Sequence, residues 1–380
     1  MVEWKKLGDI AKRNKGIPIT AGQMSELNTS NGNVRVFAAG QTLADINETD
    51  LPKNCAHIKP SIIVKSRGYI DFVFYEKPFT HKNEMWSYSF DDKEEGKFFY
   101  YYLTTKTELF RKKAKANSVK LPQLCVSDTD DYLVPYPSHS EQGRIVGVLD
   151  TFTSSIDNLK QQIALRRKQY EYYRDQLLDL EGKEGVEMKA LGTFGDVTKL
   201  AGFELTEHVR YQESGNIIAL RGLNVRNGHL DLGQVKYIDG SNFSKLERSK
   251  LKRNDILFTY VGTIGNVALI DEDNKYYLAP NVSRIRFDSC VILPHFALYI
   301  FLSNYFYRTQ INKFLNSSSM KNLSMENIRK FTIPVPSLQE QQRIVDILDK
   351  FEASIQNLEA QLSQREKQYE YYRNKLLTFD

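Results

Sequence analysis

A long internal repeat constrains the fold of this 380-residue chain more than any other feature of its sequence. Residues 134–180 align with residues 333–379 without a gap, at a constant offset of 199, and 26 of the 47 aligned positions are identical. The identity is unbroken over KQYEYYR, which begins at Lys168 and again at Lys367. Such repeats fix the architecture, and two copies are too few for a solenoid. The chain is therefore interpreted as a duplication.

Each copy of the repeat begins with the residues that start a helix. A serine stands three residues before a glutamate, at Ser138 and Glu141 in the first copy and at Ser337 and Glu340 in the second. This spacing is a capping box, in which the serine accepts a backbone N–H and the glutamate reaches back to the cap. Gly182 suits the C-terminal cap of the first helix. We therefore expect long helices at residues 138–181 and 337–380.

The apolar residues inside each copy recur at alternating intervals of four and three, which is the heptad seam of a coiled coil. One arginine interrupts the seam at the same place in each copy, Arg166 and Arg365. Two amphipathic helices buried separately on their own domains are the alternative, but so narrow a stripe favours a coiled coil. The first seam comprises Ile145, Leu149, Phe152, Ile156, Leu159, Ile163, Tyr170, Tyr173 and Leu177, and the second follows it 199 residues later.

The charges beside the seam predict how the two helices pair. The e positions are mostly basic in the first helix and mostly acidic in the second, whereas the g positions are neutral in both. Charge would have no effect in a parallel pair, which sets e against g, but it would attract in an antiparallel pair, which sets e against e. Each exposed pair contributes only about 0.2–1 kcal/mol, so charge selects register rather than supplying stability. The favoured register joins Lys160 to Glu366, Arg167 to Glu359 and Arg174 to Glu352, and it implies an intramolecular antiparallel coiled coil with a pseudo-twofold axis.

The regions outside the helices are duplicated only in outline. SIIVKSRGYIDFVFY, from Ser61, matches DILFTYVGTIGNVAL, from Asp255, and both predict two strands joined by a turn at Gly68 or Gly262. FFYYYL and FALYIFL predict helices that pack the core. We expect an α+β protein with mixed α/β domains at residues 1–137 and 182–336. Ordinary drift after duplication and recognition of two different targets both explain why these domains differ.

Composition sets broad limits on the class of protein. The net charge of +5 and the pI of about 8.8 permit nucleic-acid binding without requiring it. Cys55, Cys125 and Cys290 lie too far apart for a disulfide framework or a zinc motif, which favours a reducing compartment. No run of 18 apolar residues occurs. We expect a cytoplasmic protein with no membrane contact.

Motifs for catalysis are missing from the sequence. An adenine methyltransferase needs a glycine-rich cofactor loop and an Asn/Asp-Pro-Pro-aromatic stretch, and an ATP-driven motor needs GxxxxGK[ST], but none of these occurs. Glu95 and Lys97 have a spacing found in nucleases, yet they lie in a charge run that is typical of a solvated loop. The histidines are dispersed without metal-ligand spacing. We therefore expect neither a catalytic residue nor a metal site.

Three stretches carry a resemblance to a known family. VPYPSHSEQGRIVGVLD and IPVPSLQEQQRIVDILD open the two helices, and NDILFTYVGTIGNV lies in the second domain. With the YEYYR-containing helix ends, they make the whole chain resemble the specificity subunit of type I restriction-modification systems. The first domain departs from the hairpin pattern, with Asp71 and Phe72 where the second has Gly265 and Asn266. The resemblance is therefore weaker for the reading loops of the first domain.

The resemblance implies a non-catalytic subunit that binds double-stranded DNA. Two target-recognition domains would each read one half of a bipartite target, while the helices set the spacer and dock two methyltransferase subunits. S-adenosylmethionine would be carried by those subunits, and restriction subunits would join them. A helix of about 33 residues spans about 50 Å, or about 15 base pairs, which accommodates two half-sites and a spacer. A DNA-binding protein without partners and a coiled-coil adaptor for other proteins are the alternatives.

Candidate contact residues follow from the chemistry that each partner requires. Phosphates attract Lys and Arg, and bases are read by Arg, Lys, Asn or Gln on loops. Tyrosine and arginine are favoured anchors of protein interfaces, and each helix carries one outward tyrosine in the same place. The candidates for DNA are Lys65, Arg67, Lys82, Asn117, Lys120, Arg221, Arg226, Tyr260, Asn281, Lys321 and Asn322. The candidates for the methyltransferase are Tyr172, Arg174, Tyr371 and Arg373.

Overall fold

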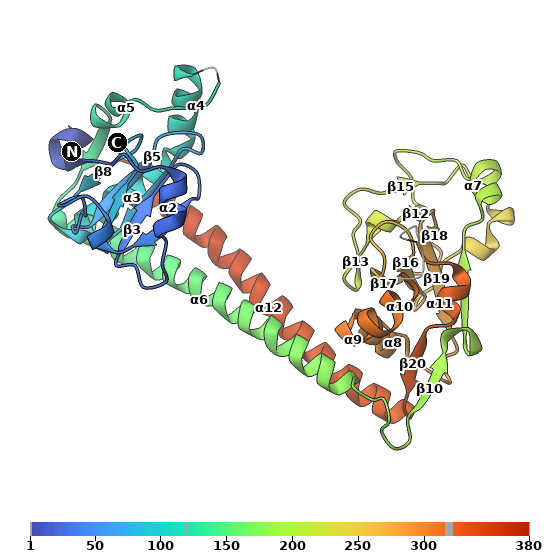
Figure 1. Cartoon of the computed structure of the whole chain (residues 1–380). Helices are drawn as coiled ribbons and strands as arrows, with labels where there is room; N and C mark the ends of the chain where they lie inside the picture. The colour runs from blue at the N-terminus through green and yellow to red at the C-terminus, as the bar shows by residue number, and fades with distance from the viewer. Residues whose placement is uncertain (1, 119, 316–321, 380) are drawn as a thin grey trace. The chain divides into compact units, whose positions relative to one another are not determined.

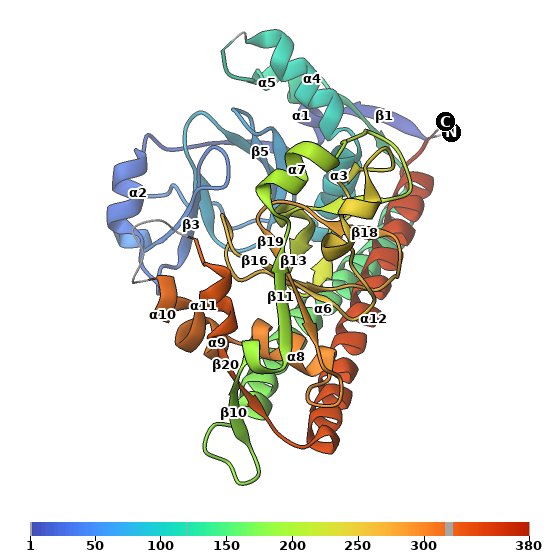
Figure 2. The same cartoon turned by 90° about the vertical axis from the view of Figure 1, so that its right-hand side faces the viewer.

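The computed structural model describes residues 2–118, 120–315 and 322–379. The chain forms two compact units. The first unit comprises the residues up to Gln161 together with those from Ala360 onward, and the second comprises residues 162–359. Two long helices, α6 (His139–Leu178) and α12 (Leu338–Leu376), run side by side, and each contributes to both units (Figures 1 and 2).

The first unit contains two small sheets with helices packed against them. One sheet is antiparallel with the order β2-β8-β5-β6, and the other has the order β4-β3-β7, in which β3 and β7 run parallel. Its strands are β1 (Glu3–Lys6), β2 (Lys12–Lys15), β3 (Val34–Phe37), β4 (Leu43–Ile46), β5 (Ser61–Lys65), β6 (Asp71–Tyr75), β7 (Phe79–His81), β8 (Trp86–Ser89) and β9 (Leu133–Tyr136), of which β1 pairs with β9. Its α-helices besides the long pair are α1 (Leu7–Ile10), α2 (Ala21–Leu27), α3 (Lys93–Thr105), α4 (Thr107–Asn117) and α5 (Val126–Asp130).

The second unit repeats this plan with an additional short hairpin, β13–β14. The sheets have the orders β11-β19-β16-β17 and β15-β12-β18, and β12 and β18 run parallel. Its strands are β10 (Glu187–Ala190), β11 (Gly195–Lys199), β12 (Ile218–Leu220), β13 (Val225–Arg226), β14 (His229–Leu230), β15 (Lys236–Tyr237), β16 (Ile256–Thr259), β17 (Val267–Leu269), β18 (Tyr276–Leu278), β19 (Val282–Phe287) and β20 (Thr332–Val335), of which β10 pairs with β20. Its α-helices besides the long pair are α7 (Gly202–His208), α8 (Pro294–Leu302), α9 (Asn304–Phe306), α10 (Asn312–Leu315) and α11 (Met325–Arg329).

The shared frame shows which positions of the two units are equivalent. The segment after β5 in the first unit, and after β16 in the second, shares an equivalent backbone hydrogen bond with the loop before α5 or α11. The Leu124 N–H donates to the Ser66 carbonyl at 2.8 Å, and the Leu323 N–H donates to the Tyr260 carbonyl at 2.9 Å. The residues just before these acceptors, Lys65 and Thr259, are therefore equivalent. The expected α+β duplication is confirmed, with the hairpin β13–β14 and the short helices after α3 and α8 differing between the units.

At the start of each long helix the serine caps the backbone as expected, but the glutamate does not complete the capping box. The Glu141 N–H donates to the Ser138 hydroxyl at 3.4 Å, but the glutamate carboxylate accepts two hydrogen bonds from Arg144, one turn further on. The second copy repeats this arrangement 199 residues later, with a cap distance of 3.3 Å. The expected C-terminal cap is also corrected, because α6 ends at Leu178 and Gly182 lies in the turn beyond, at a φ of +76°.

The two long helices pack antiparallel, as the charge pattern predicted. In the first unit the Lys160 ammonium lies 3.4 Å from the Glu366 carboxylate, and in the second unit Arg167 pairs with Glu359 at 2.5 Å. Both ion pairs belong to the predicted register. Their side chains are between 41% and 62% exposed, so they specify the register and add little stability.

The third expected ion pair is wrong. Arg174 is buried and pairs with the neighbouring Asp175 at 2.9 Å, and its guanidinium lies 5.6 Å above the ring of Tyr170. Glu352 instead accepts a hydrogen bond from the Tyr170 hydroxyl at 3.1 Å. Burial, followed by the charge of Glu352, raises the pKa of Tyr170. Tyr170, a residue of the seam, therefore replaces Arg174 as the partner of Glu352.

The arginines that interrupt the seam are explained by aromatic contacts between the helices. Arg166 lies 6.0 Å above the ring of Phe351, and Arg365 lies 5.7 Å above the ring of Phe152. Each phenylalanine also stacks on a tyrosine of the other helix, with ring centroids 5.4 Å apart in both units. These stacking tyrosines are Tyr173 and Tyr372. A cation above an aromatic face is attractive, so the arginine is part of the seam rather than a break in it.

Each unit has a core that is closed by both long helices. In the first unit Leu149, near the start of α6, and Leu377, just past the end of α12, are buried in one cluster with Phe98 and Phe99 of α3. In the second unit the roles are exchanged: Leu178 at the end of α6 and Leu348 near the start of α12 share a cluster with α8. The two ends of each helix are thus built into different cores.

Candidate nucleic-acid interface

The turn after β5 presents the candidate cations of the first unit. Arg67 is exposed in this turn, and its backbone bridges to Gln123 in the loop that precedes α5. Lys120 is exposed in the same loop, and the structure gives it no ion pair with a described residue. The strand pairing that joins turn and loop therefore brings these two candidates to one surface.

Helix α4 adds basic residues that the sequence reasoning missed. Lys112 and Lys115 are exposed on this helix and make no ion pair with a described residue. Arg111 donates to the carbonyl of Ile70, which follows the turn, and its guanidinium lies 4.9 Å from the ring of Tyr69. The run RKKAKA was a visible signal, because such a run on one helix forms a basic patch.

The other first-unit candidates already have partners. Lys65 is 8% exposed, and its ammonium donates to the carbonyl of Gly40 at 2.5 Å. The Lys82 ammonium lies 3.1 Å from Glu84. The Asn117 amide donates to the Asp128 carboxylate at 2.8 Å. As the structure stands, Lys65 is a buried structural residue rather than a surface contact, because it occupies the last position of a core strand.

In the second unit, three candidates surround one loop surface. Tyr260 follows β16, is half-buried, and has a pKa raised by that burial; its N–H donates to the carbonyl of Asn281 at 3.2 Å. Asn281 is exposed and adopts a φ of +72°, a left-handed conformation that asparagine tolerates. Asn322 is exposed and bridges to Val261. Lys321 lies outside the described residues.

Two arginines complete the second set. Arg226, on the β13–β14 hairpin, is exposed and pairs with Asp231 at 3.3 Å. Arg221 donates to the carbonyl of Gln234 at 3.0 Å, and its Nε is buried without a hydrogen-bond partner among the described residues. The structure therefore places Arg221 with Tyr260 and Asn281 around the same loops, while Arg226 projects from a separate hairpin.

A pocket of about 520 Å³ opens between these loops of the second unit. Its lining includes Arg221 and Asn281 together with residues that sequence reasoning did not single out. These are Tyr211, Gly222, Leu223, Lys236, Thr259, Val261, Thr263 and Pro280, and Gly262 of the expected turn completes the lining. No local sequence signal identifies the pocket, because its walls come from loops that are far apart in the chain.

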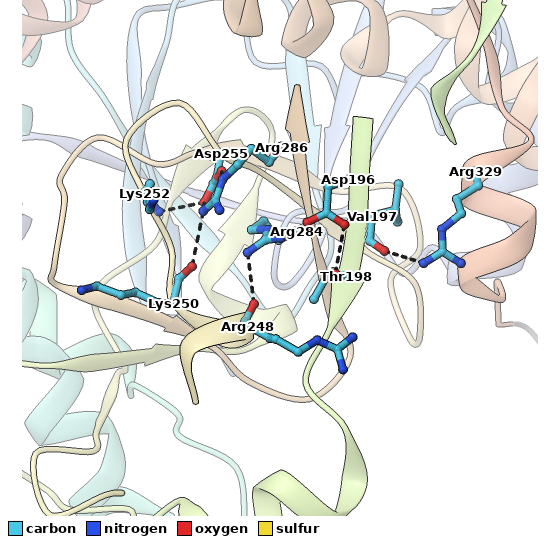
Figure 3. Close-up of polar contacts among 10 residues, drawn as sticks. All are labelled: Asp196, Val197, Thr198, Arg248, Lys250, Lys252, Asp255, Arg284, Arg286 and Arg329. Carbon is cyan, nitrogen blue, oxygen red and sulfur yellow. Dashed lines mark hydrogen bonds and ion pairs between the residues drawn. The ribbon is translucent and has the colours of Figure 1, made fainter. Parts of the chain in front are cut away.

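Other arginines of the second unit serve its framework (Figure 3). Arg286 forms two hydrogen bonds of 2.7 Å with the buried carboxylate of Asp255, and these bonds raise the pKa of the arginine. Arg284 is 4% exposed, pairs with Asp196, and donates to the carbonyl of Arg248 at 3.1 Å. Arg284 is thus a buried cation and Arg286 a half-buried one, and cations held by carboxylates and carbonyls in this way are not available to a phosphate.

The outer face of the helix pair presents the two candidate tyrosines. Tyr172 and Tyr371 are each 60% exposed at equivalent places of the repeat. Arg174 is only 8% exposed, and Arg373 is half-buried with its guanidinium 5.5 Å above the ring of Tyr369. The tyrosines are therefore the accessible members of the expected set, while the arginines support the seam.

The residues considered for catalysis and metal binding have the following surroundings. Among them, no group of three or more His, Cys, Asp or Glu side chains could hold a metal ion. Glu95 accepts a hydrogen bond from the Tyr136 hydroxyl at 2.8 Å, and Lys97 pairs with Asp150 at 2.5 Å, so both belong to the packing of the first unit. No helix in the described part of the chain is long and apolar enough to cross a membrane.

Comparison with known proteins gives a consistent result. The chain is 28% identical to a putative type I restriction enzyme specificity subunit of Haemophilus influenzae, over 100% of this chain and 96% of the relative. It is 27% identical to the EcoR124I/EcoR124II specificity subunit of Escherichia coli, over 100% of this chain and 94% of the relative. The crystal structure of a type I restriction-modification S subunit from M. genitalium superposes with a TM-score of 0.63 at 17% identity, covering 100% and 97% of the two chains, which supports the fold.

The family model of the type I restriction modification DNA specificity domain matches the chain twice, at residues 1–165 and 183–366. Each match includes one globular part and most of the long helix that follows it. The match covers most of the sequence and agrees with the duplicated frame, the antiparallel helix pair and the surface loops described above. The chain therefore belongs to the family of type I restriction-modification specificity subunits and carries two recognition domains.

Proposed function

We propose that each recognition domain reads one half of a bipartite DNA target, and that the helix pair sets the spacer and docks two methyltransferase subunits. The observation that carries this proposal is the contrast between the two halves of the chain. The strand order and the helix contacts are repeated, whereas the loops around Gly68 and Gly262 carry different side chains. Two domains that share one fold but carry different surface loops are suited to binding two different half-sites.

The proposed function leaves the chemistry of methyl transfer to the partners. S-adenosylmethionine would be bound by the methyltransferase subunits, and restriction subunits would join that assembly. Sequence specificity would come from this chain alone. The proposed recognition domains are residues 1–137 and 182–336.

A domain exchange tests the division of labour. Residues 1–137 are replaced by the corresponding part of a family member that has a different target, and methylated sites are mapped in cells that also express the methyltransferase. We expect one half of the methylated sequence to change while the other half and the spacer stay the same. A change in both halves, or in neither, would contradict the proposal.

Charge removal tests the reading surface of the first domain. We expect the combined change of Arg67, Lys112 and Lys120 to Gln to weaken DNA binding by the assembled complex for all sequences and to flatten its salt dependence. Lys350→Gln, an exposed change on α12, is the control and should leave both quantities unchanged. Equal binding by the triple variant and the control would place the phosphate contacts elsewhere.

The repeated tyrosines are proposed as the anchors of the two methyltransferase subunits. If the helix pair binds one methyltransferase subunit at each of two symmetric sites, both sites need the same surface. This requirement explains why the sequences of the two helices remain similar. The double change Tyr172→Ala with Tyr371→Ala should weaken the complex of two methyltransferase subunits with one specificity subunit. Analytical ultracentrifugation of the mixture measures this.

Leu165→Ala provides a matched control for the tyrosine changes. Leu165 is 62% exposed on α6, similar to the tyrosines, but its counterpart in the repeat is Gln364. Leu165 therefore cannot belong to a surface that is the same in both copies of the repeat. Assembly should survive this change. If the double tyrosine variant also assembles at unchanged affinity, docking lies on the domains or on the helix starts.

A further inference from the structure

The pocket of the second domain has the lining of a site for a flat, partly apolar group. Two large apolar side chains at the pocket are unusually accessible, since Tyr211 is 45% exposed and Leu223 is 44% exposed. Val261 and Pro280 add further apolar surface. Arg221 and Asn281 place a guanidinium and an exposed amide in the same lining. Exposed aromatic and aliphatic walls beside a few polar groups are the usual composition of a ligand site.

The first domain fills the equivalent place with its own side chain. Lys65 is equivalent to Thr259, and Gly40 lies in the turn after β3, as Leu223 lies in the turn after the corresponding strand β12. The Lys65 side chain extends across this space and donates to the Gly40 carbonyl at 2.5 Å. The shorter Thr259 leaves the space open, since its hydroxyl donates locally to the Thr263 carbonyl. The two domains therefore differ at one structural position, closed in the first and open in the second.

The charges around the pocket decide between a phosphate and a base as the ligand. Lys236 is paired with Glu213, and Arg221 donates one terminal N–H to the Gln234 carbonyl while its Nε is buried, so neither cation is free to approach a phosphate. A phosphate needs cations that are free to approach it. A base has a flat face that stacks on an aromatic ring, and its edge needs only a few donors and acceptors. The accessible ring of Tyr211 and the amide of Asn281 supply these two requirements.

We propose that this pocket receives one nucleobase of the half-site that the second domain reads. The inference rests on the proposed function, since it names the part of the DNA that this surface contacts. Tyr211 and Leu223 would contact the face of a displaced base or the apolar group at the edge of a base that stays stacked, and Asn281 would read the edge of the base in either case. The first domain, closed by Lys65, would read its half-site without such a pocket. The base comes either from a displaced nucleotide or from the edge of a base that stays in the helix.

Thr259→Lys tests the inference, because it places in the second domain the residue that closes the first. The variant is assembled with the methyltransferase, and binding is measured on duplexes in which each position of the two half-sites is changed in turn. We expect the wild-type preference at one position of the second half-site to fall by roughly 5- to 150-fold, the range of one good hydrogen-bonded contact to a base edge. Preferences in the first half-site should not change.

Thr259 also supports the hairpin, so a second variant separates pocket closure from misfolding. The Asn266 N–H donates to the Thr259 hydroxyl at 2.9 Å, and lysine would lose this bond. Leu223→Glu leaves the bond intact and puts a carboxylate at the pocket wall, where it should remove the same single preference. Lys65→Thr in the first domain is the matched control, and it should leave the preferences of the second half-site unchanged.

Fluorescence of 2-aminopurine distinguishes the two sources of the base. The probe is placed at the position that responds to the variants, and wild-type complex is added. A rise in fluorescence that is absent with Leu223→Glu identifies a displaced base, whereas a preference lost without any rise identifies an edge read within the helix.

Failure of the inference and failure of the proposed function give different results. If both pocket variants bind DNA with the wild-type preference at every position, the pocket takes no base, and the inference is overturned while the proposed function stands. If the wild-type complex shows no sequence preference at all, the proposed function itself fails.

Discussion

The same buried glutamine has different surroundings at the start of the two long helices, which predicts unequal effects of one substitution. Gln341 is fully buried; its amide donates to the carbonyls of Val291 and Pro336 at 3.0 and 2.9 Å, and its Oε1 accepts the Leu293 N–H at 2.8 Å. Gln142, its repeat counterpart, is 1% exposed and donates only to the carbonyl preceding its cap, at 3.0 Å, while its Oε1 is buried without a partner among the described residues.

Replacement by leucine keeps the approximate volume and removes these bonds. At Gln341 three hydrogen bonds are lost, and at Gln142 only one. At about 0.5–1.5 kcal/mol for each net bond, Gln341→Leu should lower the free energy of unfolding by about 1–3 kcal/mol more than Gln142→Leu. Removal of the unpaired oxygen at Gln142 widens this gap, because burying it without a partner is unfavourable.

Urea unfolding of the two full-length variants measures the difference in stability, and hydrogen exchange locates it. The Leu293 amide should exchange faster in Gln341→Leu and at the wild-type rate in Gln142→Leu. Equal destabilisation by the two changes, or a larger effect at Gln142, would refute the reasoning from hydrogen-bond number.

Two further predictions concern the helix pair and the first domain. Cysteines at Lys160 and Glu366 should crosslink within one monomer under mild oxidation, whereas cysteines at Lys160 and Glu359 should not; the opposite result on a non-reducing gel would exclude the observed register. The Arg35 guanidinium, which forms hydrogen bonds of 2.7 and 2.8 Å with Asp45, holds the pKa of that carboxyl below its ordinary value of 3.8. The pair therefore stabilises the fold above that ordinary value and loses its effect as the pH falls through the lowered pKa. The difference in urea midpoint between wild type and Arg35→Gln should shrink over this acid range, and a difference that is constant with pH would contradict the assignment.

The helix pair was predictable from sequence because its determinants are local and periodic. The heptad spacing predicted the seam, and the e-position charges predicted its orientation and the pairs Lys160–Glu366 and Arg167–Glu359. Arg174 departed from the pattern because the adjacent Asp175 is a nearer partner than a carboxylate across the seam. A prediction that considers only the charges at the e positions does not include competition from an acidic residue next to the arginine in the same helix.

The candidate interface was less predictable because exposure depends on tertiary neighbours. Lys65 ends an apolar strand, a position from which a lysine can point to solvent or cross the domain, and only the Gly40 carbonyl decides between them. The pocket beside Thr259 depends on a difference between two side chains at equivalent places, which becomes visible only after the frames are matched. The lysines of α4 could have been selected from their sequence run alone.

The closure of each core by both long helices has a consequence for the order in which the chain acquires its structure during synthesis. The second unit is a continuous segment, residues 162–359, so all its parts are made before Ala360. The first unit contains the residues from Ala360 onward, and its core includes Leu377, which is made after every residue of the second unit. Domains generally fold as units in the order of their synthesis. Here the order is reversed: the half that is made first keeps part of its apolar surface uncovered until the last turns of α12 arrive, and the half that is made second is completed first.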